Sequence, residues 1–236
     1  MSTAVLYSGQ ARTIAQCLPT QAWHVFRHFP DLHFFIVWQN DPNAVAGVKL
    51  LEDKYGKDRV HAKLIEDPTD LPLIPLHYGE HAPYSNMGVT HKQLLTQHWY
   101  QNEVGTWFDK WGSEVFTTVI RMRGDLFFHR FDEAPVEAGD RVCYSPWWGR
   151  FGGVADRFAI MGREASRHYF TVFQKIQKLL DAGCPFHPES LLKASLDDGG
   201  ILILDTLTAE FSTLRLDGTM RRWESEVGPD VSQFVR

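Results

Sequence analysis

Three charged residues in the middle of the chain have the types and the spacing of a ligand site. Arg121, Arg123 and Asp125 stand at every second position, directly after an apolar, β-branched run at residues 115–120. That run has the composition of a buried strand, and side chains two residues apart share one face of a strand. Charges at the end of a buried strand are costly unless they are paired or used. Residues 115–128 therefore predict either a site for a phosphorylated, metal-bound ligand or a structural Arg–Asp pair.

The beginning of the chain offers a second position for ligand chemistry. An apolar strand at residues 4–7 leads into Gly9 and Gln10, and Arg12 follows. Glycine lets backbone N–H groups approach a ligand closely, and an arginine can bind a phosphate or a carboxylate. The same pattern also fits a glycine that serves only the turn, so the junction is a candidate site without being diagnostic.

A third candidate is the segment at residues 146–160, which holds three glycines, two tryptophans, Asp156 and Arg157. Tryptophan rings suit the apolar faces of sugar rings as well as protein cores, and glycines let a loop fold tightly over a ligand. Asp156 stands where the sequence turns apolar again. We interpret it as a functional carboxylate, with a helix N-cap or an ion-pair partner for Arg157 as the alternatives.

Apolar runs that end in turn residues, with helical patterns between them, predict an α/β protein with a mostly parallel sheet. The expected strands are residues 4–7, 32–38, 59–65 and 115–120, with shorter ones at 141–145, 200–205 and 211–216. One continuous helix is expected at residues 164–180. Ligands bind beyond the carboxyl ends of such strands, so Gly9, Asp41 and Asp125 are expected along one edge of the sheet.

Two further features have mainly structural explanations. Residues 67–87 hold four prolines and show no periodicity, which predicts a long loop. His77 and His81 in this loop are interpreted as solvated histidines in preference to a metal pair. Glu189 follows Pro188 at the start of another predicted helix, where an acidic residue in the first turn is accounted for by capping.

Composition narrows the class of protein. The 236 residues carry a formal net charge of −5 and no basic tail, which argues against a nucleic-acid partner. The three cysteines are widely spaced and form no C-x-x-C pair, which indicates a reducing compartment. No apolar run reaches the length of a transmembrane segment, and the N-terminus lacks a signal-peptide pattern. A cytoplasmic protein is therefore expected.

Three of these motifs together resemble small glycosyltransferases of the GT-A type, in the group of bacterial and viral proteins that modify polysaccharides. The motifs are YSGQAR at residues 7–12, IRMRGDLFF at residues 120–128 and GGVADRFAIM at residues 152–161. FHPE at residues 186–189 adds weaker support. The resemblance implies a single GT-A-like domain over residues 1–220, with residues 221–236 as a polar C-terminal tail.

The resemblance also implies roles for individual residues. Those expected to contact a nucleotide sugar are Gly9, Gln10, Arg12, Arg121, Arg123, Trp148 and Gly153. Asp125 matches the last acid of the motif that binds a divalent cation, Mn²⁺ or Mg²⁺, on the donor diphosphate. Arg123 stands where the first acid of that motif is usual, so arginines could neutralise part of the diphosphate themselves. Asp156 matches the acid that faces donor sugar and acceptor, and is the expected catalytic residue.

The resulting hypothesis is transfer of a sugar from a nucleoside-diphosphate sugar to a hydroxyl group of a glycan or lipid-linked acceptor. Such a reaction needs charge stabilisation of the leaving group and a base for the acceptor hydroxyl. Two other classes remain open: a non-catalytic module that binds nucleotide sugars or glycans, and a metal-dependent phosphohydrolase. The second normally needs several metal-binding acids or histidines, of which only Asp125 is well placed.

Overall fold

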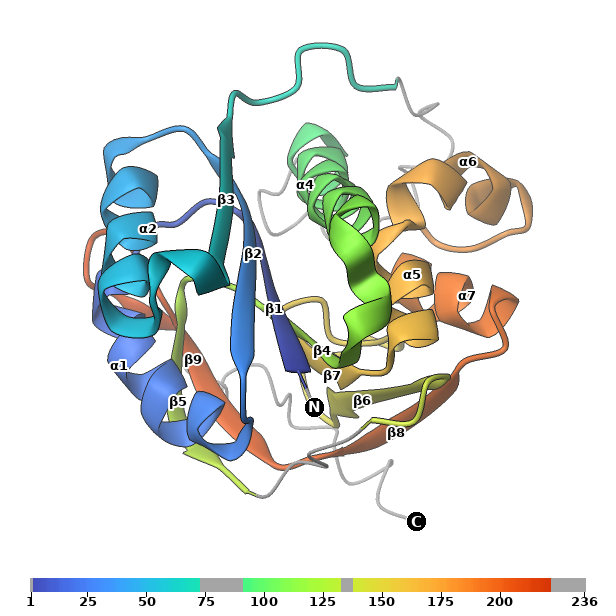
Figure 1. Ribbon diagram of the computed structural model, residues 1–236. Coiled ribbons are helices and arrows are strands. Elements are labelled where there is room, and N and C mark those ends of the chain that lie inside the picture. Colours follow the sequence, from blue (N-terminus) through green and yellow to red (C-terminus); the bar gives the residue numbers. More distant parts are fainter. Residues whose placement is uncertain (1, 73–90, 133–137, 222–236) are drawn as a thin grey trace.

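The computed structural model describes residues 2–72, 91–132 and 138–221 (Figure 1). The strands are β1 (Ser2–Gly9), β2 (Leu32–Gln39), β3 (Val60–Ile65), β4 (Phe116–Met122), β5 (Leu126–Phe131), β6 (Val142–Pro146), β7 (Phe158–Met161), β8 (Leu202–Leu207), β9 (Ala209–Leu214) and β10 (Met220–Arg221). The α-helices are α1 (Ile14–His24), α2 (Pro42–Tyr55), α4 (His91–Gly112), α5 (Arg163–Phe170), α6 (Val172–Asp181) and α7 (Pro188–Asp198). His77, His81 and the predicted tail beyond residue 221 lie outside the described residues.

Seven strands form the central sheet in the order β3-β2-β1-β4-β7-β6-β8. The first four run parallel to one another, β6 runs parallel to β8, and β7 is antiparallel to both of its neighbours. The predicted α/β architecture with a mostly parallel sheet is confirmed. Because β1 pairs directly with β4, the residues after Gly9 and those after Met122 emerge at the same edge.

Helices cover both faces of this sheet (Figure 1). α1 and α2 lie on one face, and α4 to α7 lie on the other. Alternating side chains of β1 enter both cores: Ala4 and Leu6 belong to the cluster that includes α4 to α7, while Val5 and Tyr7 belong to the cluster beneath α1 and α2. A strand that is covered on both faces has to be apolar throughout, which explains why β1 and β2 are so clear in the sequence.

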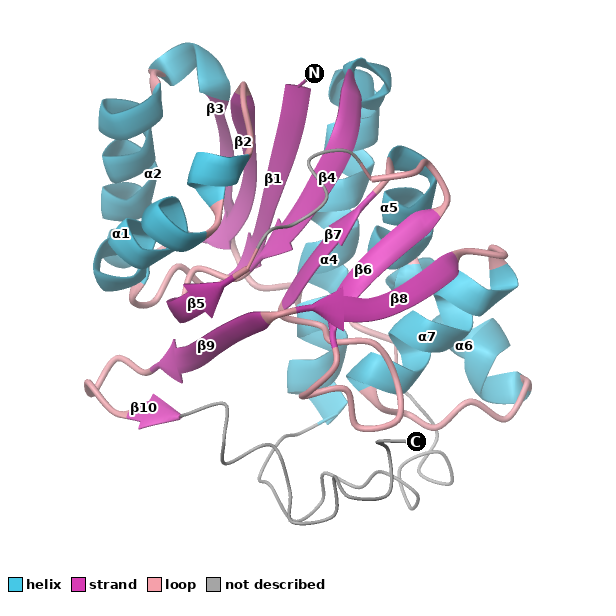
Figure 2. Cartoon of the chain, turned by 90° about the horizontal axis from the view of Figure 1, so that it is seen from below, coloured by secondary structure: helices cyan, strands magenta, loops and turns pink. Residues whose placement is uncertain are grey.

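The central stretch contains the expected strand, but the alternation of strand side chains does not extend from β4 to Asp125. β4 ends at Met122, a turn follows, and β5 joins a separate sheet of order β10-β9-β5 (Figure 2). Gly124 allows this turn to lie against the loop after β1, because a Cβ at this position would stand 2.9 Å from the carbonyl oxygen of Ala11. Asp125 is therefore placed by a turn and not by the alternation of a strand.

Two other local predictions change in the structure. The helix expected at residues 164–180 is divided into α5 and α6 at Thr171, whose hydroxyl donates a 2.7 Å hydrogen bond to the carbonyl of Arg167 and competes with the helical bond. Asp41 lies at the end of β2, as expected, but its carboxylate accepts a 2.8 Å hydrogen bond from Ala44 N and caps α2.

Two findings bear on the expected cellular context. All three cysteines are free, two of them buried and Cys184 partly exposed. Among the described residues, no helix has both the length and the apolar composition that a membrane crossing requires.

Candidate active site

A cleft of about 620 Å³ opens at the carboxyl edge of β1 and β4, where open parallel sheets bind ligands. Most of the predicted site residues line this cleft: Gly9, Gln10, Arg12, Arg121, Arg123, Asp125 and Asp156. Trp148 and Gly153 are not among the lining residues. The fold thus brings together the charged residues of the first two motifs with the aspartate of the third.

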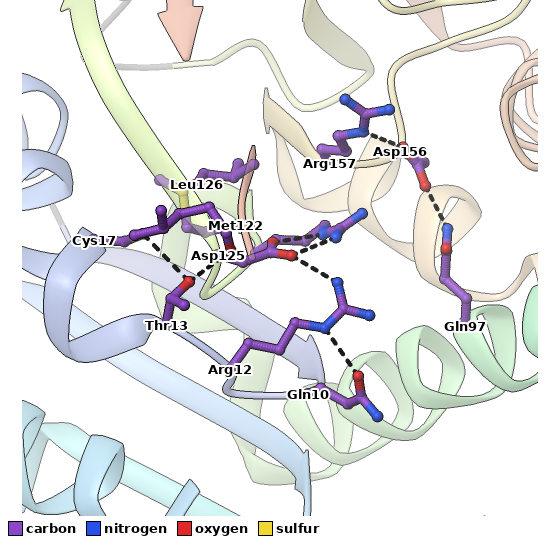
Figure 3. A network of polar contacts seen from close by, with 12 residues as sticks. Gln10, Arg12, Thr13, Cys17, Gln97, Met122, Asp125, Leu126, Asp156 and Arg157 are labelled. Atoms are coloured by element: carbon purple, nitrogen blue, oxygen red, sulfur yellow. Dashed lines mark hydrogen bonds and ion pairs between the residues drawn. The ribbon is translucent and has the colours of Figure 1, made fainter. Parts of the chain in front are cut away.

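One side of the cleft is built around Asp125, a buried carboxylate that two arginines bind (Figure 3). Arg12 Nη1 donates to Asp125 Oδ2 at 2.8 Å, while Arg123 donates from Nε to Oδ1 at 2.9 Å and from Nη2 to Oδ2 at 2.6 Å. Burial by itself would raise the pKa of Asp125, but the charges and hydrogen bonds of Arg123 and Arg12 outweigh it and lower the pKa to about 2. The carboxylate is therefore ionised at every physiological pH.

Arg12 is held in place by its neighbours as well as by Asp125. Its Nε donates a 2.9 Å hydrogen bond to Gln10 Oε1, and Gln10 Nε2 donates at 2.8 Å to Gln39 Oε1 at the end of β2. The backbone of Arg12 has a φ of 45°, a left-handed conformation that is unfavourable for residues other than glycine. Such strain is maintained only where the surroundings fix the backbone, as the two glutamines and Asp125 do here.

A third arginine, Arg215, reaches the same place from the end of β9. Leu214 N donates a 2.9 Å hydrogen bond to the carbonyl of Asp125, and Thr13 Oγ1 donates at 2.9 Å to the carbonyl of Leu214. These two bonds join three segments that are far apart in the sequence. Arg215 is half-buried, lines the cleft, and forms no ion pair with any residue in the described ranges. Burial first, and then the charges of Arg12 and Arg123, lower its pKa.

We call Arg12, Arg123 and Arg215, together with Asp125, the arginine side of the cleft. This group does not fit the divalent cation that the resemblance implies. Both carboxylate oxygens of Asp125 are bound by guanidinium groups, and the described part of the chain contains no cluster of three or more His, Cys, Asp or Glu side chains that could hold a metal ion. Mg²⁺ and Mn²⁺ favour several oxygen ligands, above all carboxylates, and are repelled by nearby guanidiniums.

Asp156 lies on the opposite side of the cleft, in the segment before β7 (Figure 3). Gln97 of α4 donates a hydrogen bond to its Oδ2, and Arg157 Nε lies 3.8 Å from Oδ1. Burial would raise the pKa of Asp156, but Arg157, Arg123, Gln97 and Arg121 together lower it. Its Oδ1 is buried and accepts no hydrogen bond from any described residue, which is costly for a carboxylate unless a ligand completes the set.

The backbone around Asp156 is fixed from two directions. The fully buried Arg121 donates from Nε to the carbonyl of Asp156 at 3.2 Å and from Nη1 to that of Met122 at 3.0 Å. The hydroxyl of Tyr169 donates at 2.9 Å to the carbonyl of Ala155. Arg121 thus joins the end of β4 to the Asp156 segment, and its contacts are those of a positioning residue.

The structure adds a third buried carboxylate to the cleft, Glu189, which sequence reasoning assigned to helix capping. Glu189, in the first turn of α7, lines the cleft and has an Oε2 that lies 3.0 Å from His187 Nδ1. Burial, and next the charge of Asp156, raise the pKa of Glu189, and His187 only partly offsets this. We call Asp156 and Glu189 the carboxylate side of the cleft. The pKa values of these two carboxyl groups are therefore shifted in opposite directions by their surroundings.

The glycine-rich loop packs against the start of α7, the helix that carries Glu189 of the carboxylate side. Gly153 packs so tightly on the start of α7 that a Cβ would stand 2.0 Å from the carbonyl oxygen of Glu189, and Val154 N donates to that same oxygen at 3.0 Å. Trp148 is only 5% exposed, and its indole N–H donates to the carbonyl of Ala209 at 2.8 Å. The position of Trp148 therefore corresponds to the core alternative. Phe151, which is 41% exposed, is the aromatic residue of this loop that lines the cleft.

The described residues that line the cleft have the opposite net charge to the chain. Among them the basic residues outnumber the acidic ones, although the chain carries a formal net charge of −5. The basic residues are Arg12, Lys92, Arg121, Arg123, Arg157, Arg215 and Arg221, and the acidic ones are Asp67, Asp125, Asp156 and Glu189. A concave site lined by an excess of one charge focuses the electric field and concentrates ligands of the other, here anions.

No protein-family model matches the sequence, and a search of curated proteins finds no match. Similar solved structures include the apo form of the glycosyltransferase GlyE of Streptococcus pneumoniae TIGR4, which is 12% identical over 86% of this chain and 44% of GlyE, with a TM-score of 0.43. The galactosyltransferase LgtC, in complex with donor and acceptor sugar analogs, is 8% identical over 86% of this chain and 72% of LgtC, with a TM-score of 0.49. The chain thus spans less than half the length of GlyE. These proteins are glycosyltransferases, the class that the sequence motifs resemble, but at this level of similarity a function has to be inferred from the cleft itself.

Proposed function

We propose that the chain transfers a sugar from a nucleoside-diphosphate sugar to a hydroxyl group of a glycan or lipid-linked acceptor. The observation that carries this proposal is the division of one cleft into an arginine side and a carboxylate side. Arginines can stabilise an anionic leaving group, and a carboxylate can accept the proton of a hydroxyl nucleophile.

The arginine side would hold the donor. Guanidinium groups bind phosphate oxygens through paired, charge-assisted hydrogen bonds, and these strengthen as negative charge develops on the leaving diphosphate. Gly9, with its φ of 98°, allows the backbone after β1 to approach the nucleotide closely. Gln10 and Arg12 lie at the same corner.

The carboxylate side would hold the acceptor. In the proposed reaction the bond between the anomeric carbon and the diphosphate oxygen breaks, and its electron pair leaves with the nucleoside diphosphate. The acceptor oxygen forms the new bond to the anomeric carbon, and its proton passes to Asp156 Oδ1, the oxygen that accepts no hydrogen bond within the described residues. The exposed ring of Phe151 supplies an apolar face for a sugar ring at the entrance to this side.

A thermal-shift screen of nucleoside-diphosphate sugars tests donor binding, and transfer to glycan acceptors tests the reaction. We expect at least one donor to stabilise the chain more than its free nucleoside does, since ligands that bind only the folded state raise the melting temperature. Stabilisation without transfer to any acceptor would instead support a non-catalytic binding module. Absence of stabilisation by every nucleotide sugar would contradict the proposal.

A further inference from the structure

We propose that the cleft binds the diphosphate of its ligand directly through Arg12, Arg123 and Arg215, with Asp125 holding Arg12 and Arg123 in place and without a divalent cation. This inference rests on the proposed function, since it concerns the donor diphosphate. It gives Arg215 a binding role that the sequence did not indicate, and it assigns to Asp125 the orientation of guanidiniums in place of metal binding.

Charge counting is the first argument. Arg12 and Arg123 bind one buried carboxylate and Arg215 lines the same cleft, so the group has an excess of two positive charges. The diphosphate of a nucleotide sugar carries two negative charges, and it gains a further one when the sugar leaves. Arg123 and Arg12 are already bound to Asp125, whereas Arg215 forms no ion pair among the described residues. An anion is the ligand that balances this group.

Preorganisation is the second argument. Arg12, Arg123 and Arg215 lie in three segments that are far apart in the sequence but joined by two hydrogen bonds. Thr13 Oγ1 donates to the Leu214 carbonyl, and Leu214 N donates to the Asp125 carbonyl, both at 2.9 Å. The turn at Gly124 lies directly on the backbone of Ala11. Donors that are fixed before the ligand arrives bind developing charge without reorganisation, which is what a diphosphate leaving group requires.

The occupancy of Asp125 is the third argument. Its oxygens accept three hydrogen bonds from guanidinium nitrogens at 2.6 to 2.9 Å. A cation that coordinated the same oxygens would stand beside these guanidiniums, where charge repulsion opposes it. Binding a metal at Asp125 would therefore require both arginines to leave, and the strained backbone of Arg12 would lose the contact that maintains it.

Calorimetric titration of the chain with inorganic pyrophosphate, in the presence of EDTA and then of excess Mg²⁺, tests the proposal. We expect pyrophosphate to bind in EDTA and Mg²⁺ not to strengthen this binding. Arg215→Ala should weaken binding by roughly 10- to 100-fold, the effect of one charge-assisted contact. Binding that appears only with Mg²⁺ would overturn the proposal.

Arg130→Ala is the matched control, because it removes the same charge from an exposed arginine of the neighbouring β5. An equal loss of pyrophosphate affinity in Arg215→Ala and Arg130→Ala would also overturn the proposal, since it would show a nonspecific charge effect. If Arg215→Ala does not fold, Arg215→Lys replaces it: this variant keeps the charge but loses the paired donors, so weaker binding of pyrophosphate is again expected.

The outcomes separate this inference from the proposed function. Sugar transfer that requires a divalent cation would reject the arginine-based site and leave the transferase standing. Pyrophosphate binding in EDTA that depends on Arg215, combined with no transfer from any nucleotide sugar, would preserve the anion site and reject the reaction.

Discussion

Two Arg-x-Asp pairs in this chain have nearly the same local geometry and very different surroundings. Arg123 donates from Nε and Nη2 to Asp125 at 2.9 and 2.6 Å, and Arg130 donates from the same atoms to Asp132 at 2.8 and 2.7 Å. The side chain of Asp125 is 2% exposed, whereas that of Asp132 is 45% exposed. The two pairs lie on either side of the same segment, one in the cleft turn and one at the end of β5.

The two pairs differ in the charged residues that lie beside them from other parts of the chain. The cleft pair gains Arg12 directly and Arg215 nearby, so arginines outnumber its one carboxylate. The exposed pair gains Glu210, with Arg130 Nη1 3.8 Å from Glu210 Oε1, so acids outnumber its one arginine. An Arg-x-Asp sequence therefore does not define an anion site. Tertiary contacts decide whether the pair is closed or still able to bind a ligand.

The largest expected effect concerns Asp156, the carboxylate that lines the same cleft as the Arg123–Asp125 pair. Asp156→Asn keeps the shape and the bond from Gln97 but removes the proton acceptor. We expect turnover to fall by roughly 10²- to 10⁴-fold with little change in donor affinity. Rates and donor Kd would be measured beside Asp132→Asn, which should behave as the wild type. An unchanged rate would remove Asp156 from the mechanism.

The next effect concerns the stability of the cleft pair. A carboxylate whose pKa falls from 3.8 to about 2 on folding contributes roughly 2–3 kcal/mol at neutral pH. Asp125→Asn should therefore lower the free energy of unfolding by about that amount in urea denaturation. Asp132→Asn, in the exposed pair, should change it little. Equal losses in the two variants would show that the buried pair contributes no more to stability than the exposed one.

A comparison of the two arginines tests ligand binding. Arg123→Ala should weaken the binding of a nucleoside diphosphate by roughly 10- to 100-fold and leave the binding of the free nucleoside nearly unaffected, because only the diphosphate contacts the guanidinium. Arg130→Ala should affect neither ligand. Calorimetry with both ligands gives the answer, and an equal loss for nucleoside and diphosphate would place Arg123 away from the phosphates.

The smallest effect is the pH dependence of the cleft pair. Because the pKa of Asp125 is lowered in the folded chain, its contribution is complete above about pH 4 and is lost as the pH falls through about 2. The difference in unfolding free energy between wild type and Asp125→Asn should be constant near neutrality and shrink below about pH 4. A difference that persists at pH values near 2 would mean that the Asp125→Asn substitution destabilises the fold for a reason other than lost charge.

The individual strands could be predicted from the sequence, but the contacts that they create between distant segments could not. β1, β2 and β3 are covered on both faces or end in turn residues, so composition alone marks them. Arg215 lines the same cleft as Asp125 only because β9 pairs with β5, a contact between segments that no local pattern connects. The binding of Asp125 by Arg12 likewise joins distant segments, whereas the resemblance to GT-A enzymes implied that Asp125 is a metal ligand.

Ambiguous residue types account for the remaining differences at the site. Tryptophan serves cores and sugar rings equally well, and Trp148 lies in the core while Phe151 lines the cleft. Glu189 fits the first turn of a helix whether or not it does anything else, and only the packing of Gly153 against α7 places it beside Asp156. Such choices depend on tertiary burial, which the sequence pattern does not contain.

The identity of the nucleotide product tests the central claim most directly. The chain would be incubated in EDTA with a nucleoside-diphosphate sugar selected by thermal shift, together with an acceptor, and the products would be separated by ion exchange and weighed by mass spectrometry. Cleavage at the anomeric carbon predicts nucleoside diphosphate and a glycosylated acceptor. Nucleoside monophosphate with sugar phosphate would instead show cleavage between the phosphates, the reaction of a phosphohydrolase, and would contradict the account.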